Sequence, residues 1–69
     1  MKLSARNQLK GKIVAVTKGQ TTAHVRIDIG GGLIVTSSIT KDAAEELGLA
    51  AGQPATVLVK STEVMIGVD

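Results

Sequence analysis

The most regular hydrophobic pattern in the chain is the strict alternation over residues 23–29. The apolar positions are Ala23, Val25, Ile27 and Ile29, and the polar positions between them are His24, Arg26 and Asp28. Successive side chains of a β-strand point to opposite faces of the sheet, so this period is typical of a strand with one face in the core. We therefore expect residues 23–29 to form a half-buried strand, with His24 exposed on its outer face.

Four other segments are rich in β-branched and apolar residues and end at turn-forming residues. They cover residues 9–17, 33–39, 55–60 and 64–68. The glycines at 30–32 can adopt positive φ without steric cost, so they are expected to turn the chain and to join the second and third strands as an antiparallel hairpin. Met65, in the last segment, is expected to pack in the core.

One short helix is predicted after the third strand. Thr40 is a good N-cap, Asp42 favours the positive end of the helix dipole, and residues 43–47 are helix formers that stop at Gly48. The predicted fold class is therefore all-β, a five-stranded OB-like barrel with one short helix between strands 3 and 4. Because no repeat, linker or low-complexity segment interrupts the chain, residues 1–69 are expected to form a single domain.

The composition indicates that this fold needs partners. A chain of 69 residues is short, and such a chain buries only roughly 60% of its unfolded surface. It has no Cys and one His, so neither a disulfide nor a structural metal site is expected to add stability. Its apolar content of 43% includes no Phe, Tyr or Trp. We therefore expect the chain to self-associate through a surface of small aliphatic residues.

Hydropathy and charge exclude some locations and partners. No apolar run approaches the ~18 residues of a membrane span, and the N-terminus lacks the apolar core of a signal peptide. We therefore expect a soluble, cytoplasmic protein with no membrane partner. Eight basic and six acidic residues are interspersed along the chain and give a net charge of +2. Small anions suit this charge better than nucleic acid, which favours a dense basic patch.

Hydrogen-bond donors cluster at three predicted strand ends. The opening stretch 4–13 holds hydroxyl, guanidinium and amide groups, and the other clusters are residues 39–41 and 59–61. Strand ends expose side chains and backbone N–H groups to ligands. If the three clusters converge, they form a site for an anion.

Two specific motifs give the chain a family resemblance: Ser4-Ala5-Arg6-Asn7-Gln8 at its start and Lys60-Ser61-x-x-Val64-x-Ile66-Gly67 near its end. With them the chain resembles, over essentially its whole length, the molbindins, which are small stand-alone Mop-type proteins. The same TOBE/Mop module recurs in molybdate-responsive regulators and in molybdate-transporter ATPases. The resemblance implies an OB-like barrel assembled into a homohexamer, a trimer of dimers, that binds molybdate or tungstate at subunit interfaces. It also implies the absence of catalytic activity.

The resemblance, carried over residue by residue, implies an interface site for the oxyanion. Its members are Ser4, Arg6, Thr40, Lys60 and Ser61. Related modules place a hydroxyl where this chain has Ala43, so the contact expected from Ala43 is its backbone N–H. Asn7 is expected to orient the opening motif instead of touching the ligand.

A second class of site in the family lies where three subunits meet and relies on backbone amides. By position, Lys18, Gly19 and Gln20 are the residues expected there. Both kinds of site suit a tetrahedral dianion, which needs several N–H and O–H donors and one or two cations. A helix start adds free amides and a favourable dipole. Asp42 has to point away from such a ligand, because its carboxylate would repel it.

Other function classes fit the sequence less well. OB-like barrels that bind nucleic acids use aromatic stacking platforms, and this chain has none. The DNA-binding alternative is a swapped-hairpin transcription factor of the AbrB type, which residues 39–41, 46–49 and Gly52 resemble. That motif is short, it leaves residues 4–11 unexplained, and it requires a basic face for phosphates.

Catalysis is not expected, because the sequence offers no nucleophile and base pair, no carboxylate dyad and no metal cluster. Together with the resemblance, which implies binding of molybdate or tungstate, this favours a protein that stores or buffers these oxyanions inside the cell, for molybdenum and tungsten homeostasis.

Overall fold

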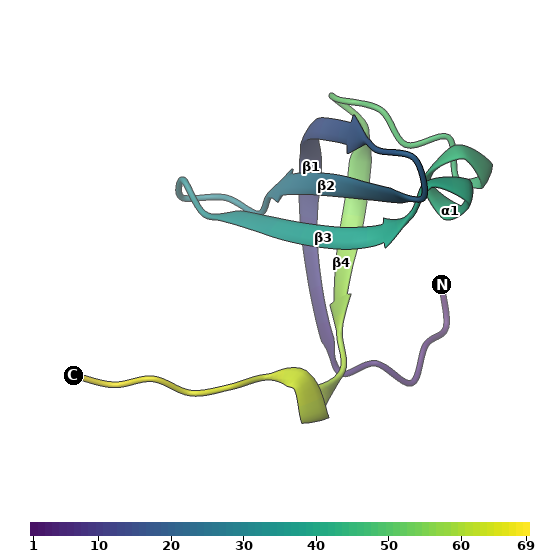
Figure 1. Ribbon diagram of the computed structural model, residues 1–69. Coiled ribbons are helices and arrows are strands. Elements are labelled where there is room, and N and C mark those ends of the chain that lie inside the picture. Colours follow the sequence, from purple (N-terminus) through teal and green to yellow (C-terminus); the bar gives the residue numbers. More distant parts are fainter.

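The longest strand, β1 (Asn7–Lys18), connects the two halves of the fold. In the computed structural model, which describes residues 1–69, β1 pairs antiparallel with β2 (Thr22–Asp28) and with β4 (Pro54–Val59). β3 (Ile34–Thr40) pairs antiparallel with β2, so the strand order is β3-β2-β1-β4 (Figure 1). The helix α1 (Lys41–Glu46) follows β3, and the 3-10 turn η1 (Ser61–Glu63) follows β4.

β1 bends so that its two halves have different partners. Its first half pairs with β4 and its second half with β2, and the register shifts between Ile13 and Ala15. Such a bulge bends a strand and increases its twist. Gly11 lies at this corner, where a Cβ would collide with the carbonyl oxygen of Asp28. The sheet therefore curls, and β2 and β3 run across β1 and β4 as an open half-barrel (Figure 1).

The core lies inside this curl and is small. Five residues are buried: Ile13, Ala23, Val25, Ile27 and Ala44. Three of them come from the alternating face of β2, and His24 and Arg26 on its other face are exposed, which confirms the predicted half-buried strand.

No helix of the structure has the length and the apolar character needed to span a membrane.

The hairpin and the helix confirm the predicted local chemistry. All three glycines between β2 and β3 have positive φ, with 103°, 61° and 79° at Gly30, Gly31 and Gly32. Thr40 is the N-cap of α1, and its side chain accepts a hydrogen bond from the backbone N–H of Ala43. The chain leaves α1 through Gly48, where φ is 61°.

The predicted fifth strand is wrong for this chain taken alone. The sheet has four strands, and residues 64–68 form neither strand nor helix. Met65, expected in the core, is exposed. The pattern of these residues favours extended backbone, but a strand also needs a neighbour for its N–H and C=O groups, and the chain provides none here. The fold is therefore an open, all-β half-barrel with one short helix, and the five-stranded barrel is not formed.

Candidate anion-binding site

The ends of β1 and β4 bring the two sequence motifs together. Because Asn7 pairs with Val59, the residues before Asn7 lie beside the residues after Val59. An open depression of about 460 Å³ forms there. Its lining residues are Ser4, Ala5, Arg6, Leu58, Lys60, Ser61 and Thr62. Four of the residues expected in the interface site, Ser4, Arg6, Lys60 and Ser61, thus share one depression.

Two side-chain amides hold the opening motif in this position. The Nδ2 of Asn7 donates to the carbonyl oxygen of Val59 at 3.2 Å, and so ties the start of β1 to the end of β4. The Nε2 of Gln8 donates to the carbonyl oxygen of Ala5 at 2.8 Å, which folds the preceding loop back on the strand. Asn7 therefore orients the motif through the backbone, in line with its expected role.

The donors of the depression are not used within the chain. The side chains of Ser4, Arg6, Lys60 and Ser61 take part in none of the side-chain hydrogen bonds. The one ion pair of the chain joins Lys41 Nζ to Glu45 Oε1, at 4.0 Å and on the surface. Arg6 and Lys60 therefore bring two positive charges to one depression without a carboxylate partner. No side chain caps η1, so its first backbone N–H groups lack a side-chain acceptor.

Thr40 and Ala43 lie elsewhere, at the start of α1. The Oγ1 of Thr40 accepts the backbone N–H of Ala43 at 3.0 Å. The backbone donor that was expected from Ala43 is thus already engaged, while the hydroxyl hydrogen of Thr40 is free to donate. Asp42 lies in the first turn of α1, as predicted, and has no hydrogen-bond or ion-pair partner.

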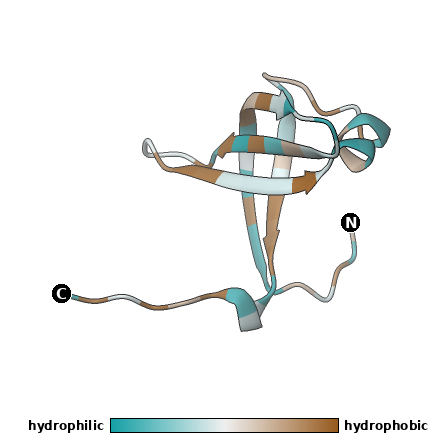
Figure 2. Cartoon of the chain, viewed as in Figure 1, coloured by the Kyte–Doolittle hydropathy of each residue, from teal (hydrophilic) through white to brown (hydrophobic).

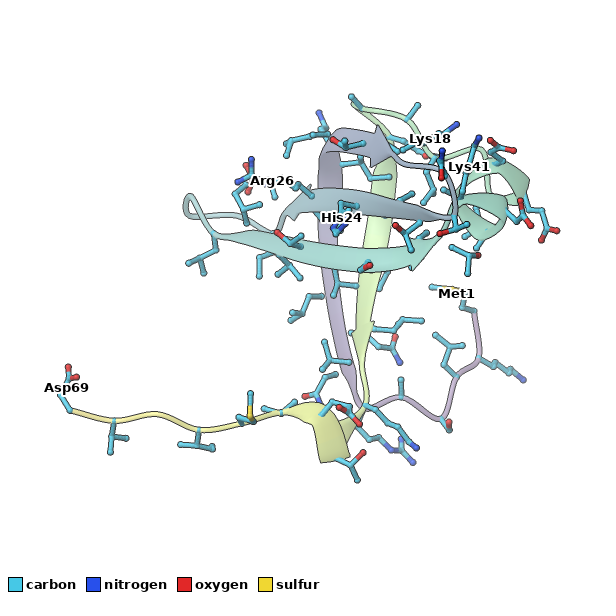
Figure 3. The ribbon with its side chains drawn as sticks, in the orientation of Figure 1. Met1, Lys18, His24, Arg26, Lys41 and Asp69 are labelled. Atoms are coloured by element: carbon cyan, nitrogen blue, oxygen red, sulfur yellow. The ribbon has the colours of Figure 1, made fainter.

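The turn that holds Lys18, Gly19 and Gln20 adjoins the start of α1. The backbone N–H of Lys41 donates to the carbonyl oxygen of Thr21 at 2.9 Å, and Figure 3 shows Lys18 and Lys41 beside each other near α1. The backbone N–H of Gly19 donates to the carbonyl oxygen of Thr22 at 2.8 Å. The backbone amide of Gly19, one of those expected at a three-fold site, is therefore already hydrogen-bonded within the turn.

The expected donors thus form two groups at opposite ends of β1. The cationic depression lies at the N-terminal end of β1. Thr40 and the turn at residues 18–20 lie at its C-terminal end. One chain does not bring both groups around one ion. Thr62 and Leu58 line the depression although the sequence analysis did not select them; the hydroxyl of Thr62, next to the Lys60-Ser61 pair, was the available signal.

The described residues contain no group of three or more His, Cys, Asp or Glu side chains that could hold a metal ion. The chemistry offered at the depression is that of cationic and hydroxyl donors, which suits a ligand with several negatively charged oxygens.

Comparison with known proteins gives a consistent family. The TOBE domain model matches residues 3–66. Molybdenum-pterin-binding protein 3 of Clostridium pasteurianum is 56% identical over 66 residues, which cover 96% of this chain and 97% of that protein.

Solved structures agree with this match. MopII from Clostridium pasteurianum superposes with a TM-score of 0.91 at 52% identity, over 97% of this chain and 100% of that one. ModG, described as a cytoplasmic molybdate-binding protein and solved with molybdate bound, superposes with a TM-score of 0.94 at 39% identity. The match to ModG covers all of this chain and 49% of that chain.

Proposed function

The chain belongs to the TOBE-domain family and, within it, to the small Mop-type molybdenum-pterin-binding proteins, the molbindins, and from this premise we propose that it binds molybdate. Tungstate has the same tetrahedral shape and charge, so the proposed site accepts it as well. The relatives' names point to molybdenum binding and give no support to the swapped-hairpin DNA-binding alternative.

The presence of Arg6 and Lys60 in one depression is the observation that carries this proposal. Both cations line one depression, neither has a carboxylate partner, and the hydroxyls of Ser4 and Ser61 are beside them. Charge-assisted hydrogen bonds to an anionic oxygen are roughly twice as strong as neutral ones. An unneutralised pair of cations among free hydroxyls is therefore suited to a dianion.

We propose that the complete site lies between subunits. Thr40, whose hydroxyl accepts the Ala43 amide and keeps its own hydrogen free to donate, comes to the ion from a different copy than Arg6 and Lys60, because the two groups lie at opposite ends of β1. The proposed assembly is a homohexamer built as a trimer of dimers. A second, three-fold site at Lys18, Gly19 and Gln20 belongs to the same proposal.

The proposed role is storage or buffering of the oxyanion in the cytoplasm, for molybdenum and tungsten homeostasis. ModG, one of the similar structures, is described as cytoplasmic. The family is one of binding proteins, and the proposal includes no catalytic activity, no nucleic-acid partner and no membrane partner.

Native mass spectrometry with and without molybdate tests the function and the assembly together. A hexamer that gains several molybdate ions, but not sulfate ions at equal concentration, is the expected result. Size separates the two anions, because donors set for the larger ion leave long hydrogen bonds to the smaller one. A protein that ignores molybdate at every subunit number would overturn the proposed function.

A further inference from the structure

Thr62 lines the cationic depression together with Lys60 and Ser61, at a position that the Lys60-Ser61 motif leaves open. Its hydroxyl takes part in none of the hydrogen bonds that side chains make within the chain. The residue is exposed. The depression therefore holds a third free hydroxyl, in addition to those of Ser4 and Ser61.

The turn η1 begins where the hydrophobic end of β4 stops. Val57, Leu58 and Val59 close the strand, and the chain becomes hydrophilic at Lys60 and in η1 (Figure 2). None of the residues of η1 is buried. Their side chains are therefore not needed by the core and are open to a ligand.

Two backbone hydrogen bonds fix the shape of η1. The N–H of Glu63 donates to the carbonyl oxygen of Lys60 at 2.9 Å. The N–H of Val64 donates to the carbonyl oxygen of Ser61 at 3.3 Å. With three residues per turn, successive side chains of a 3-10 turn point in three different directions. Ser61 and Thr62 line the depression and Glu63 does not, so the turn presents two hydroxyls and keeps its only carboxylate outside the lining.

The position of Glu63 matters for the charge of the depression. A carboxylate inside it would attract Arg6 and Lys60 and would repel an anion. Glu63 forms no ion pair with either cation, because the one ion pair of the chain joins Lys41 to Glu45. Both cations therefore stay available to a ligand, although a carboxylate follows directly in the turn.

We propose that Thr62 is a further binding residue of the oxyanion site and that its hydroxyl donates a hydrogen bond to an oxygen of the bound ion. This inference rests on the proposed function and deepens it. A tetrahedral oxyanion presents four oxygens that accept hydrogen bonds, so a third hydroxyl beside the two cations has an acceptor to bind. Thr62 belongs to the same chain as Arg6 and Lys60, and thus to the part of the site that one copy carries.

The side chain of Thr62 is suited to hold its hydroxyl in place. Its Cβ carries two heavy atoms, which restrict χ1, and the hydrogen bonds of η1 fix the backbone beneath it. Arg6 and Lys60 reach the depression through long side chains with many rotamers. Thr62 therefore supplies a donor that loses less conformational freedom on binding than either cation does.

Three variants of the full chain test the hydroxyl, with the Kd for sodium molybdate measured by isothermal titration calorimetry. Thr62→Val removes the hydroxyl at nearly constant shape and is expected to raise the Kd about tenfold or more, because a hydrogen bond to a charged group is lost. Thr62→Ser keeps the hydroxyl and is expected to stay within about threefold of the parent, because only the restriction of χ1 changes. Thr36→Val removes a hydroxyl from an exposed position of β3 outside the depression and is expected to leave the Kd unchanged.

An exchange of two neighbouring residues tests the orientation of η1. The double variant Thr62→Glu, Glu63→Thr keeps the composition and net charge of the parent but brings the carboxylate into the depression. It is expected to abolish measurable molybdate binding. Glu63→Gln removes the carboxylate from its natural position outside the lining and is expected to leave the Kd within about threefold of the parent. Circular dichroism without molybdate shows that each variant is folded.

The outcomes separate this inference from the proposed function. Equal Kd values for the parent and Thr62→Val, or tight binding by the exchanged variant, would overturn the inference and leave the proposed function standing. Equal losses in Thr62→Ser and Thr62→Val would also overturn it, because the effect would then come from the shape of the side chain. A parent protein that ignores molybdate would overturn the proposed function, and the inference with it.

Discussion

At the scale of single residues, Arg6 and Lys60 differ from the other cations in their surroundings and not in their charge. Both are exposed, and the backbone beside them is held by the amides of Asn7 and Gln8. The guanidinium and the ammonium themselves are left free. In the proposed site the backbone is thus held by hydrogen bonds, and the charged groups would be free to turn toward a ligand.

Replacement of Arg6 by Ala tests this view. The substitution removes charge-assisted hydrogen bonds, which are worth about 1.5–3 kcal/mol each, so the Kd for molybdate is expected to rise about tenfold to hundredfold. Isothermal titration calorimetry measures the change. Lys12→Ala removes the same charge from an exposed position outside the depression and is expected to leave the affinity nearly unchanged. Equal losses in the two variants would show that only net charge matters.

Four of the expected side-chain donors lie together in the structure, whereas two of the expected backbone donors are already bonded within the chain. Ser4, Arg6, Lys60 and Ser61 share a depression because Asn7 pairs with Val59, which brings the two motifs side by side. The amides of Gly19 and Ala43 are already bonded within the chain. Whether an N–H is free depends on local backbone geometry, which residue identity does not fix.

At the scale of elements, β2 carries most of the core on one face. Val25→Asp would bury an unpaired charge among Ile13 and Ile27, at a cost of about 3–5 kcal/mol. Because small domains have only about 5–15 kcal/mol of stability, circular dichroism is expected to show a largely unfolded chain. His24→Asp, on the exposed face of the same strand, is expected to remain folded. Unfolding of both variants would contradict the assigned faces.

The corner of β1 offers a second test at this scale. A methyl group at Gly11 would collide with the backbone of Asp28 and approach Cγ2 of Ile27 to 2.8 Å. Gly11→Ala is therefore expected to lower the free energy of unfolding by about 1–3 kcal/mol in urea titrations. At Gly19 the nearest heavy atom would lie at an ordinary 3.4 Å, so Gly19→Ala serves as the control. A fully stable Gly11→Ala protein would mean that the strands separate easily at this corner.

Elements with a local cause were predictable, and the one that needs a distant partner was not. The glycine turn, the Thr40 cap and the alternation of β2 each follow from a few neighbouring residues. Residues 64–68 have a strand pattern as clear as that of β4, but the single chain provides no edge beside them. The hydrophobic pattern of a segment indicates its tendency to adopt extended backbone, but a β-strand also requires a neighbouring strand for its hydrogen bonds.

At the scale of the whole molecule, ligand binding and stability are linked. A ligand that binds only the folded state stabilises it by about 2.7 kcal/mol at one hundred times its Kd. Molybdate is therefore expected to raise the midpoint of thermal unfolding in proportion to the logarithm of its concentration. Sulfate at the same concentration is expected to raise it less, and equal shifts would indicate a general salt effect.

The small core has a consequence for how much of the protein a cell keeps. Each chain has only five buried residues, so in the proposed hexamer folding and association would become one reaction of second order. Dilute, newly made chains then stay open to proteases, and only chains that meet partners survive. Because an ion held between copies in the proposed site would favour the assembled form, degradation would slow as the ion becomes abundant. The amount of this protein in the cell would then follow the concentration of the oxyanion, without any change in gene expression.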